Sequence, residues 1–262
     1  MNTEHAPIVQ MKNIEKHFGS VIALAGVSLE VYPGECHCLL GDNGAGKSTF
    51  IKTMSGVHKP TKGEIFFEGK SMHFERPRDS ISAGIATVYQ DLAMIPLMSV
   101  SRNFFMGNEP TRRIGPISVF DHEVANEVTM SEMKKMGINL RGPDQAVGTL
   151  SGGERQTVAI ARAVHFGAKV LILDEPTSAL GVRQTSNVLA TVDRVRKNGI
   201  AVVFITHNVR HALAVGDRFT VLNRGKTLGT AQRGQITPDE LQDLMAGGQE
   251  LATLEGSLGG TV

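Results

Sequence analysis

The sequence has 262 residues, 41% hydrophobic and 20% charged, which is ordinary for a globular protein with one full-sized core or a core plus a small subdomain. Its 27 Lys and Arg residues balance 26 Asp and Glu, and a formal net charge of +1 gives no general attraction to nucleic acid, although it leaves room for a local basic patch. The uncharged runs are too short to span a bilayer and residues 1–7 lack the apolar core of a secretory signal, so we expect a cytoplasmic protein.

The N-terminal third has the patterns of an α/β protein. Residues 8–15 and 21–31 alternate apolar and polar side chains, as half-buried strands do, and residues 36–40 are a short apolar strand that stops at Gly41. A helix is predicted over 47–54, with Ser55-Gly56 as its C-terminal stop. A strand over 64–68, a helix over 78–83 and a strand over 86–89 follow.

Between residues 91 and 147 the pattern becomes helical. Two helical stretches, around 100–106 and 121–136, account with their flanks for six of the eleven Met residues. The segment 107–116 contains two Pro and two Gly and is predicted to be a loop. We interpret the region as an inserted helical subdomain that extends over about 91–165.

The alternation of strands and helices then returns. Helices are predicted over 152–165, 182–197 and 208–215, and strands over 169–173 and 201–205. Residues 218–222 and 226–229 read as a hairpin, and a last helix over 238–245 precedes a Gly-rich tail that we expect to be mobile. The pattern predicts a mainly parallel sheet with both faces covered, and an antiparallel β-subdomain at the N-terminus. The main domain is expected at 1–235, with the C-terminal helix and tail at 236–262.

Two cysteines flank a histidine at Cys36-His37-Cys38. A metal site would need further ligands at suitable spacing, and none follows in the sequence. The better interpretation is that Cys36 and Cys38 are reduced thiols at alternate positions on one face of a buried strand.

A glycine-rich segment after the third predicted strand matches G-x-x-x-x-G-K-[ST] and opens a helix. In that context backbone N–H groups converge on phosphates, and the helix N-terminus adds partial positive charge. We expect Lys47 to contact the β- and γ-phosphates of ATP and Ser48 to hold Mg²⁺. The alternative, a glycine-rich turn with an incidental Lys, does not account for the flanking strand and helix. The predicted ATP-binding residues here are Gly41, Asp42, Asn43, Gly44, Ala45, Gly46, Lys47, Ser48 and Thr49.

Two acidic residues end the apolar run 170–173. A strand so apolar is buried at the centre of the sheet, which places Asp174 at its carboxyl end, beside the phosphate loop. Asp174 is therefore predicted to order the Mg²⁺ shell, and Glu175 to act as the base that activates water for attack on the γ-phosphate.

The segment Leu150-Ser151-Gly152-Gly153-Glu154, followed by Arg155-Gln156, resembles the signature sequence of ABC ATPases. Other motifs appear in that family's order, and the resemblance covers about residues 7–235. It implies the P-loop NTPase fold, and signature residues Ser151, Gly152, Gly153 and Glu154 that cover ATP bound to a second copy. It also implies a ring at Phe18 against adenine, a Q-loop glutamine at Gln90 that helps to organise Mg²⁺ and water, a D-loop at Ser178, Ala179 and Leu180, and a switch histidine at His207.

Within that family the chain is similar to the ATP-binding subunits of bacterial sugar importers of the ribose, xylose and fructose type, on the segments 41–44, 88–93 and 176–182. Many of those subunits fuse two ATPase domains, whereas each motif occurs once here. The resemblance therefore implies a homodimer with two shared ATP sites, in which Lys47, Gln90, Glu175 and His207 serve catalysis. It also implies a membrane permease and an external sugar-binding protein as partners, uptake of a pentose or hexose, and a place on the cytoplasmic side of the inner membrane.

Two positions depart from the residues that are commoner in the family. Glu154 replaces Gln, and Ser151 with Glu154 also has the pattern of a capping box before a helix. We expect the extra carboxylate to weaken nucleotide-driven closure of the dimer mildly. Phe18 stands where Tyr is frequent, and it keeps the stacking face, so we expect little effect.

Proteins with other functions contain the same type of ATPase domain. DNA-repair members usually carry coiled-coil or zinc insertions and translation factors usually carry paired domains, and the sequence has neither. An exporter is distinguished only by the resemblance to the sugar group. A regulatory module that binds ATP without hydrolysing it is a further alternative, against which Glu175 and His207 argue. No known property of the sequence identifies the transported sugar.

Overall fold

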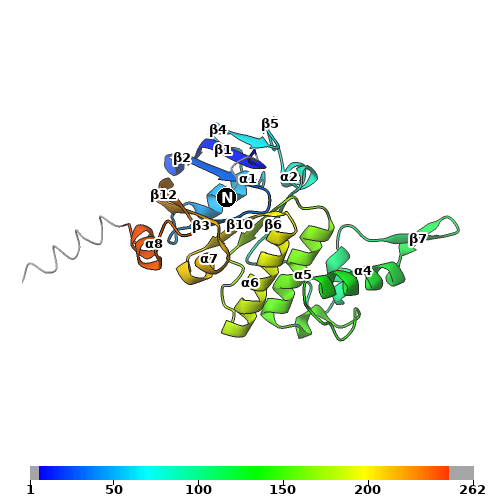
Figure 1. The fold of residues 1–262 in the computed structure, drawn as a ribbon. Helices are drawn as coiled ribbons and strands as arrows, with labels where there is room; N and C mark the ends of the chain where they lie inside the picture. Colours follow the sequence, from blue (N-terminus) through cyan, green and yellow to red (C-terminus); the bar gives the residue numbers. More distant parts are fainter. Residues whose placement is uncertain (1–5, 248–262) are drawn as a thin grey trace, which may run out of the picture.

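The computed structural model describes residues 6–247, and the tail predicted to be mobile lies almost entirely outside these residues. An antiparallel sheet forms the N-terminal part (Figure 1), in the order β2-β1-β4-β5. Its strands are β1 Val9–Phe18, β2 Val21–Val31, β4 Lys62–Phe67 and β5 Lys70–Met72. The antiparallel N-terminal subdomain is thereby confirmed, and β5 is a short edge strand that the sequence pattern does not predict.

The central sheet has the order β12-β11-β3-β10-β9-β6. Neighbours from β11 to β6 run parallel, and only β12 pairs antiparallel, with β11. The mainly parallel α/β core is confirmed. The strands are β3 Cys36–Leu40, β6 Ile85–Val88, β9 Val170–Asp174, β10 Ala201–Thr206, β11 Arg218–Asn223 and β12 Lys226–Gln232.

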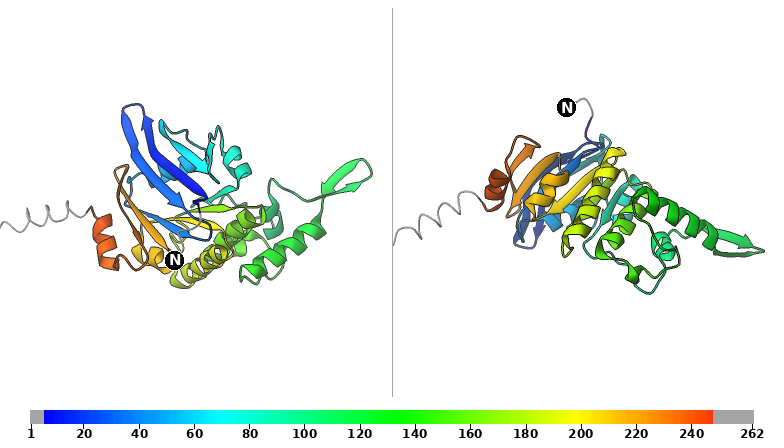
Figure 2. Two further views of the ribbon diagram at one scale, coloured as in Figure 1. Left: turned by 45° about the horizontal axis from the view of Figure 1, so that its top comes forward. Right: turned by 60° about the horizontal axis from the view of Figure 1, so that its bottom comes forward.

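Apolar side chains cover both faces of this sheet, because its central strands alternate between two hydrophobic clusters. Leu39 packs with Phe50 of α1, between the two sheets, whereas Cys36 and Cys38 belong to the cluster on the opposite face. Both side chains are buried, as the sequence predicts, and neither is part of a disulfide. Helices α5, α6 and α7 cover that opposite face (Figure 2). The helices are α1 Lys47–Met54, α2 Pro77–Ala83, α3 Val100–Phe105, α4 His122–Lys135, α5 Gly152–His165, α6 Val182–Lys197, α7 Val209–Val215 and α8 Pro238–Met245.

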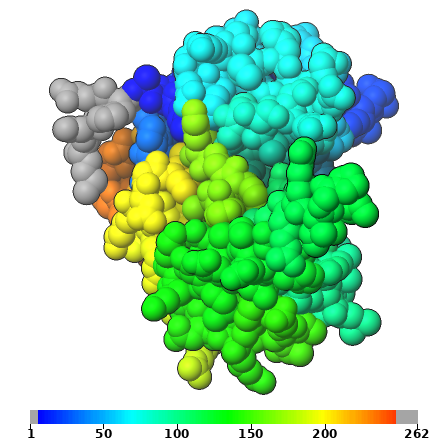
Figure 3. Space-filling model, turned by 90° about the vertical axis from the view of Figure 1, so that its right-hand side faces the viewer, coloured from blue at the N-terminus to red at the C-terminus, as the bar shows by residue number. Residues whose placement is uncertain are grey.

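The helical insertion contains α3, α4 and α5, which pack on one another through residues such as Phe104, Met133 and Val158. Figure 3 shows these segments, in green, as a continuous layer on one side of the molecule. A short 3₁₀ turn, Val147–Thr149, precedes the predicted signature segment. The helix α8 packs against α7 and β11, with Leu241 fully buried.

The predicted loop over 107–116 is wrong in part. Thr111–Ile114 (β7) and Ile117–Phe120 (β8) pair as an antiparallel hairpin, which projects away from the helices (Figures 1 and 2). Ile114 lies opposite Ile117, so Gly115 and Pro116 form a two-residue turn, with Gly115 at φ 61°. Gly115 and Pro116 form the turn of the hairpin, and the residues on both sides of them pair as strands.

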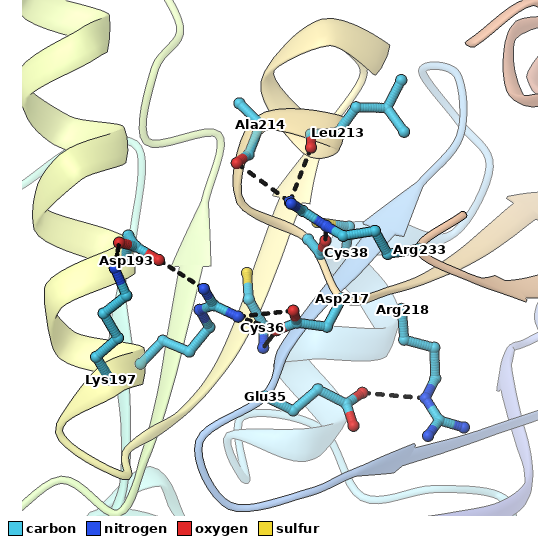
Figure 4. Close-up of polar contacts among 12 residues, drawn as sticks. Glu35, Cys36, Cys38, Asp193, Lys197, Leu213, Ala214, Asp217, Arg218 and Arg233 are labelled. Carbon is cyan, nitrogen blue, oxygen red and sulfur yellow. Dashed lines mark hydrogen bonds and ion pairs between the residues drawn. The ribbon is translucent and has the colours of Figure 1, made fainter. Parts of the chain in front are cut away.

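A polar network joins the start of β3 to three later elements (Figure 4). Asp217 accepts hydrogen bonds from the Cys36 N–H at 2.9 Å and from Arg196 of α6 at 2.6 and 2.8 Å. Arg233 donates to the carbonyl groups at the end of α7, at Leu213, Ala214 and Gly216. The network therefore fixes the ends of α6 and α7 against the central sheet. Among residues 6–247, no helix combines the length and apolarity needed to cross a bilayer.

Candidate functional site

The glycine-rich segment connects β3 to α1 through backbone conformations that favour glycine. Gly41 has φ 145°, and a Cβ there would lie 2.3 Å from the carbonyl oxygen of Leu222. Gly46 has φ 104° and directly precedes Lys47, the first residue of α1. A side chain at either position would force the loop to shift, so the two glycines bring the loop back over the helix N-terminus.

This loop lines an open cleft of about 420 Å³. Every residue from Asp42 to Thr49 contributes to the lining, so the structure brings together all but the first of the nine predicted nucleotide-binding positions there. The remaining wall consists of Val21, Ile22, Ala23 and Arg224, which the sequence analysis does not predict. Val21 and Ile22 are apolar yet 62% and 58% exposed, a signal that only the structure provides.

Phe18 is not part of this lining. It ends β1 and pairs across the hairpin with Val21, which places it next to the cleft wall. Its ring lies edge-on to His58, with 5.2 Å between centroids, and Lys16 Nζ lies 5.1 Å from the ring centre. The ring is partly exposed and is thus available for stacking beside the cleft.

Lys47 is the buried cation of the site. Its Nζ donates to the carbonyl oxygens of Gly41 at 2.5 Å and Asp42 at 3.0 Å. Burial lowers the pKa of Lys47, while the carboxylates of Glu175, Asp42 and Asp174 act in the opposite direction. These interactions show that Lys47 shares one electrostatic cluster with the acidic pair at the end of β9.

Asp174 is the last residue of β9, and Glu175 follows it. Burial raises the pKa of Asp174, and the neighbouring Glu175 raises it further, against the effect of Lys47 and Lys52. An added cation would offset this repulsion between two carboxylates. The Ser48 hydroxyl and the Asp174 carboxylate are oxygen ligands of the kind that Mg²⁺ prefers, so the donor chemistry fits that ion. Residues 6–247 contain no group of three His, Cys, Asp or Glu residues that could hold a metal ion, so these donors would need oxygens of water or nucleotide beside them.

Glu175 is held in an uncommon backbone conformation. Its φ is 48°, in the left-handed region that costs about 1–2 kcal/mol for a residue with a side chain. Its N–H donates to the carbonyl oxygen of Ile205 at 3.0 Å, and its own carbonyl accepts from Ser178 Oγ at 2.9 Å. His207, which follows β10, donates from Nδ1 to Glu175 Oε1 at 2.9 Å. Glu175 is only 15% exposed and His207 59%, so the histidine leads from the carboxylate to the surface.

The predicted signature segment forms the N-terminus of α5. Ser151 is the N-cap and its Oγ accepts from the Glu154 N–H at 3.3 Å. In return, Glu154 Oε2 accepts from Ser151 N–H and Ser151 Oγ–H, each at 2.7 Å. The predicted capping box is confirmed. None of these residues lines the cleft over the phosphate loop of the same chain.

The signature segment contacts the predicted D-loop within the chain. A Cβ on Gly152 would lie 2.7 Å from Leu180 Cδ2, and a Cβ on Gly153 would lie 3.1 Å from Gln184. A side chain at residue 153 would press on the backbone of Gln184, whereas one at residue 152 would require only that the Leu180 side chain move. Ala179 of the D-loop has φ 57°, so this turn, like Glu175, is a tight and specific conformation.

Gln90, the Q-loop glutamine of the family resemblance, follows strand β6. The strand β6 ends at Val88, so Gln90 does not end a strand but lies in the bend after it, where it is exposed. It is not among the residues that line the cleft. The structure therefore brings together Lys47, Asp174, Glu175 and His207. Phe18 lies beside the cleft wall, and Gln90 and the signature residues lie outside the cleft lining.

Comparisons with known proteins agree with this arrangement. The ABC transporter family model matches residues 24–178. The chain is 43% identical to the xylose/arabinose import ATP-binding protein of Sulfolobus acidocaldarius, over 91% of this chain and 93% of that protein. It is 39% identical to the fructose import ATP-binding protein of Rhizobium meliloti, over 93% and 95% of the two chains. A ribose import ATP-binding protein of Streptomyces coelicolor is also 39% identical, but the chain spans about half of its length, 48%.

Solved structures show the same fold. The ADP conformation of an ATP-binding cassette of an ABC transporter superposes with a TM-score of 0.81 at 24% identity, covering 96% of this chain and all of the other. A dimeric cassette bound to ADP and phosphate superposes with a TM-score of 0.72 at 25% identity, covering 87% of this chain and 100% of the other.

Proposed function

This chain belongs to the ABC transporter family of ATPases, and from that premise we propose that it hydrolyses ATP to energise the uptake of a sugar through a membrane permease. The observation that carries the proposal is the joining of a phosphate-binding loop to the hydrogen-bonded pair Glu175–His207 through the electrostatic cluster around Lys47. The sugar assignment is supported by relatives named for xylose/arabinose, fructose and ribose import.

ATP binding follows from the geometry of the phosphate loop. The N–H groups at the start of α1 carry the partial positive charge of the helix terminus, and the flanking glycines let the backbone approach the phosphates closely. Lys47 now donates to two carbonyl groups of the loop, and we infer that it turns from them to the β- and γ-phosphates. Val21 and Ile22 supply an apolar wall, and Phe18 beside them suits stacking on adenine.

Ser48, Asp174 and Gln90 would hold Mg²⁺ together with the phosphates and water. The ion would neutralise phosphate charge as the γ-phosphate leaves. Among the residues of the chain, Glu175 accepts the proton of the attacking water, and His207 contacts the γ-phosphate and helps to position that water. The hydrogen bond from His207 Nδ1 to Glu175 Oε1 holds these two side chains in contact with each other.

The signature residues would act across a dimer. Ser151 and Gly153 lie outside the cleft of their own chain, which supports a scheme in which each chain would supply one half of two shared sites. A two-fold homodimer would make both sites whole, since the same surface is then contributed by each partner.

Docking to a permease is supported by the surface that follows Gln90. Leu97 is 93% exposed and Ile95 is also exposed, although both are apolar. The buried Asn103 fixes this segment, because its amide donates to the carbonyl groups of Ile95, Met98 and Ser99. This apolar surface would bind a helix of the permease, and Gln90 would transmit the presence of nucleotide to it. Such a contact would place the chain on the cytoplasmic side of the membrane. The complete system would include an external sugar-binding protein.

Glu175→Gln tests the ATPase mechanism. We expect turnover to fall by about 10²- to 10⁴-fold, the usual scale for a positioned base, in a phosphate-release assay of the purified chain with Mg²⁺ and ATP. Binding of a fluorescent ATP analogue should persist, because the phosphate loop is unchanged. His73→Ala, which removes an exposed histidine away from the cleft, serves as the control. Turnover close to that of the wild type would remove Glu175 from the role of base.

The transport assignment needs a separate experiment. The tagged chain is purified from detergent-solubilised membranes of its native cell, and co-purifying proteins are identified. A polytopic permease with a sugar-binding protein would support import, and the binding protein could then be screened for its ligand. A permease without a binding protein would favour export, and the absence of a membrane partner would contradict transport while leaving the ATPase chemistry in place.

A further inference from the structure

The turn that carries Glu175 is fixed on one side by its own backbone. Glu175 adopts φ 48°, and its carbonyl group accepts from both the N–H and the Oγ of Ser178, at 3.1 and 2.9 Å. Thr177, between them, is almost fully buried. A turn in a strained conformation returns to a relaxed one unless surrounding contacts hold it, so the contacts of Thr177 matter for the place of Glu175.

Two histidines near the start of α7 contact this turn, His207 from just before the helix and His211 from its first turn. His207 donates to Glu175 Oε1, and one helical turn later His211 Nδ1 lies 3.0 Å from Thr177 Oγ1. These hydrogen bonds join His207 and His211 to the two ends of the three-residue stretch 175–177. The hydrogen bond between His211 and Thr177 joins two residues for which the sequence motifs predict no role.

The position of His211 is itself closely determined. Its N–H donates to Asn208 Oδ1 at 3.1 Å, and Asn208 is in turn held by Thr206 Oγ1 at 3.0 Å. Burial lowers the pKa of His211, and His207 lowers it further while Glu175 raises it, so the net effect favours the neutral imidazole. A neutral ring can share a hydrogen bond with a hydroxyl without bringing a second charge to Glu175.

The far end of α7 is anchored as well. Arg233 donates to the carbonyl groups of Leu213, Ala214 and Gly216 (Figure 4), and a Cβ on Gly216 would lie 2.5 Å from the Phe219 ring. The C-terminal end of α7 is therefore held in place by Arg233, and His211 near its N-terminal end contacts the turn through Thr177.

We propose that His211 is a positioning residue for ATP hydrolysis, which acts through Thr177 to hold Glu175 in line with His207. This inference rests on the proposed role of Glu175 as the base. His211 touches neither nucleotide nor water in this scheme. Its loss would let the turn relax and would misplace the carboxylate, which affects the chemical step more than nucleotide binding.

Substitutions on both sides of the hydrogen bond test the proposal in the full-length chain. We expect His211→Ala and Thr177→Val each to lower kcat about tenfold, equivalent to about 1.4 kcal/mol, with KM for ATP changed less than about twofold. The double variant should lose no more than the more severe single variant, because both remove one interaction. His211→Asn and Thr177→Ser, which can keep the hydrogen bond, should recover most of the activity.

A variant pair separates this inference from the proposed function. Glu175→Gln alone tests the base, and His211→Ala added to Glu175→Gln should cause no further loss in single-turnover hydrolysis. If Glu175→Gln retains turnover, the proposed function fails. Two results would overturn only the role of His211 while Glu175→Gln is impaired. One is that adding His211→Ala to Glu175→Gln lowers single-turnover hydrolysis further, and the other is that His211→Ala alone leaves kcat unchanged. Thermal unfolding of each variant and of His73→Ala distinguishes loss of folded protein from loss of kcat.

Discussion

Ser151 and Glu154 meet two demands at the scale of single residues. The capping box holds the Ser151 hydroxyl on the Glu154 carboxylate, at 2.7 Å, where the proposed dimer needs that hydroxyl for a phosphate. A carboxylate near the partner's phosphate also repels it. The cap itself is stabilising, since an acidic residue in the first turn of a helix interacts well with the helix dipole.

Glu154→Gln should therefore lower KM for ATP, by about two- to threefold, the scale of a screened charge near the surface. Glutamine can keep the box, because its amide oxygen still accepts from Ser151. Glu240→Gln is a matched control, since Glu240 forms the same box with Thr237 at the start of α8, at 2.7 and 2.8 Å. Steady-state ATPase assays should show the KM effect only at residue 154. An unchanged or higher KM there would contradict the proposed weakening of closure.

At the scale of elements, the helices and the parallel strands could be predicted, because the residues within each segment have the pattern of that element. The bounds of α1, α5, α6 and α8 agree with the sequence prediction, since apolar spacing and capping residues lie within each segment. The hairpin β7–β8 was missed because its residues are exposed except for the half-buried Val119 and Phe120, so no buried face imposes an alternating pattern. The link from Asp217 to Cys36 was also missed, because it joins residues far apart in the sequence.

That link should contribute to stability. Asp217→Ala leaves the Cys36 N–H and part of the Arg196 guanidinium without an acceptor, so we expect unfolding free energy to fall by about 2–3 kcal/mol. Asp217→Asn keeps one acceptor oxygen and should cost about half as much. Urea unfolding followed by circular dichroism measures both, with the exposed Glu64→Ala as control. Equal stability of Asp217→Ala and the wild type would show that water replaces the network.

At the scale of the whole molecule, the site divides into a predictable and an unpredictable part. The phosphate loop and the acidic pair each lie in one continuous motif, so their places follow from the motif and its flanking elements. Val21, Ile22 and Arg224 reach the cleft only through the packing of the antiparallel sheet and the β11–β12 hairpin on the loop. Thr177 and His211 likewise meet only because β9 and β10 are neighbours in the sheet.

The division of the site between two chains gives the last prediction. A Lys47→Ala chain lacks a working cradle but keeps its signature. A Ser151→Asp chain keeps its cradle and can still accept from the Glu154 N–H as an N-cap, but it loses the hydroxyl that donates to the Glu154 carboxylate and places a charge against the partner's phosphate. Each variant alone should be nearly inactive. Mixed in equal amounts, random pairing makes half of the dimers heterodimers with one whole site, so activity should return to about a quarter of the wild-type value if the two sites act independently.

The matched control mixes Lys47→Ala with Glu175→Gln. Both changes lie on the cradle side of the site, so every dimer that forms contains only defective sites, and no activity should return. Phosphate release by the two mixtures, measured at the same total chain concentration, separates the possibilities. Recovery in the first mixture alone requires that Ser151 of one chain act on ATP held by Lys47 of the other. A first mixture that gives only the sum of its separate components would mean that each chain completes its own site.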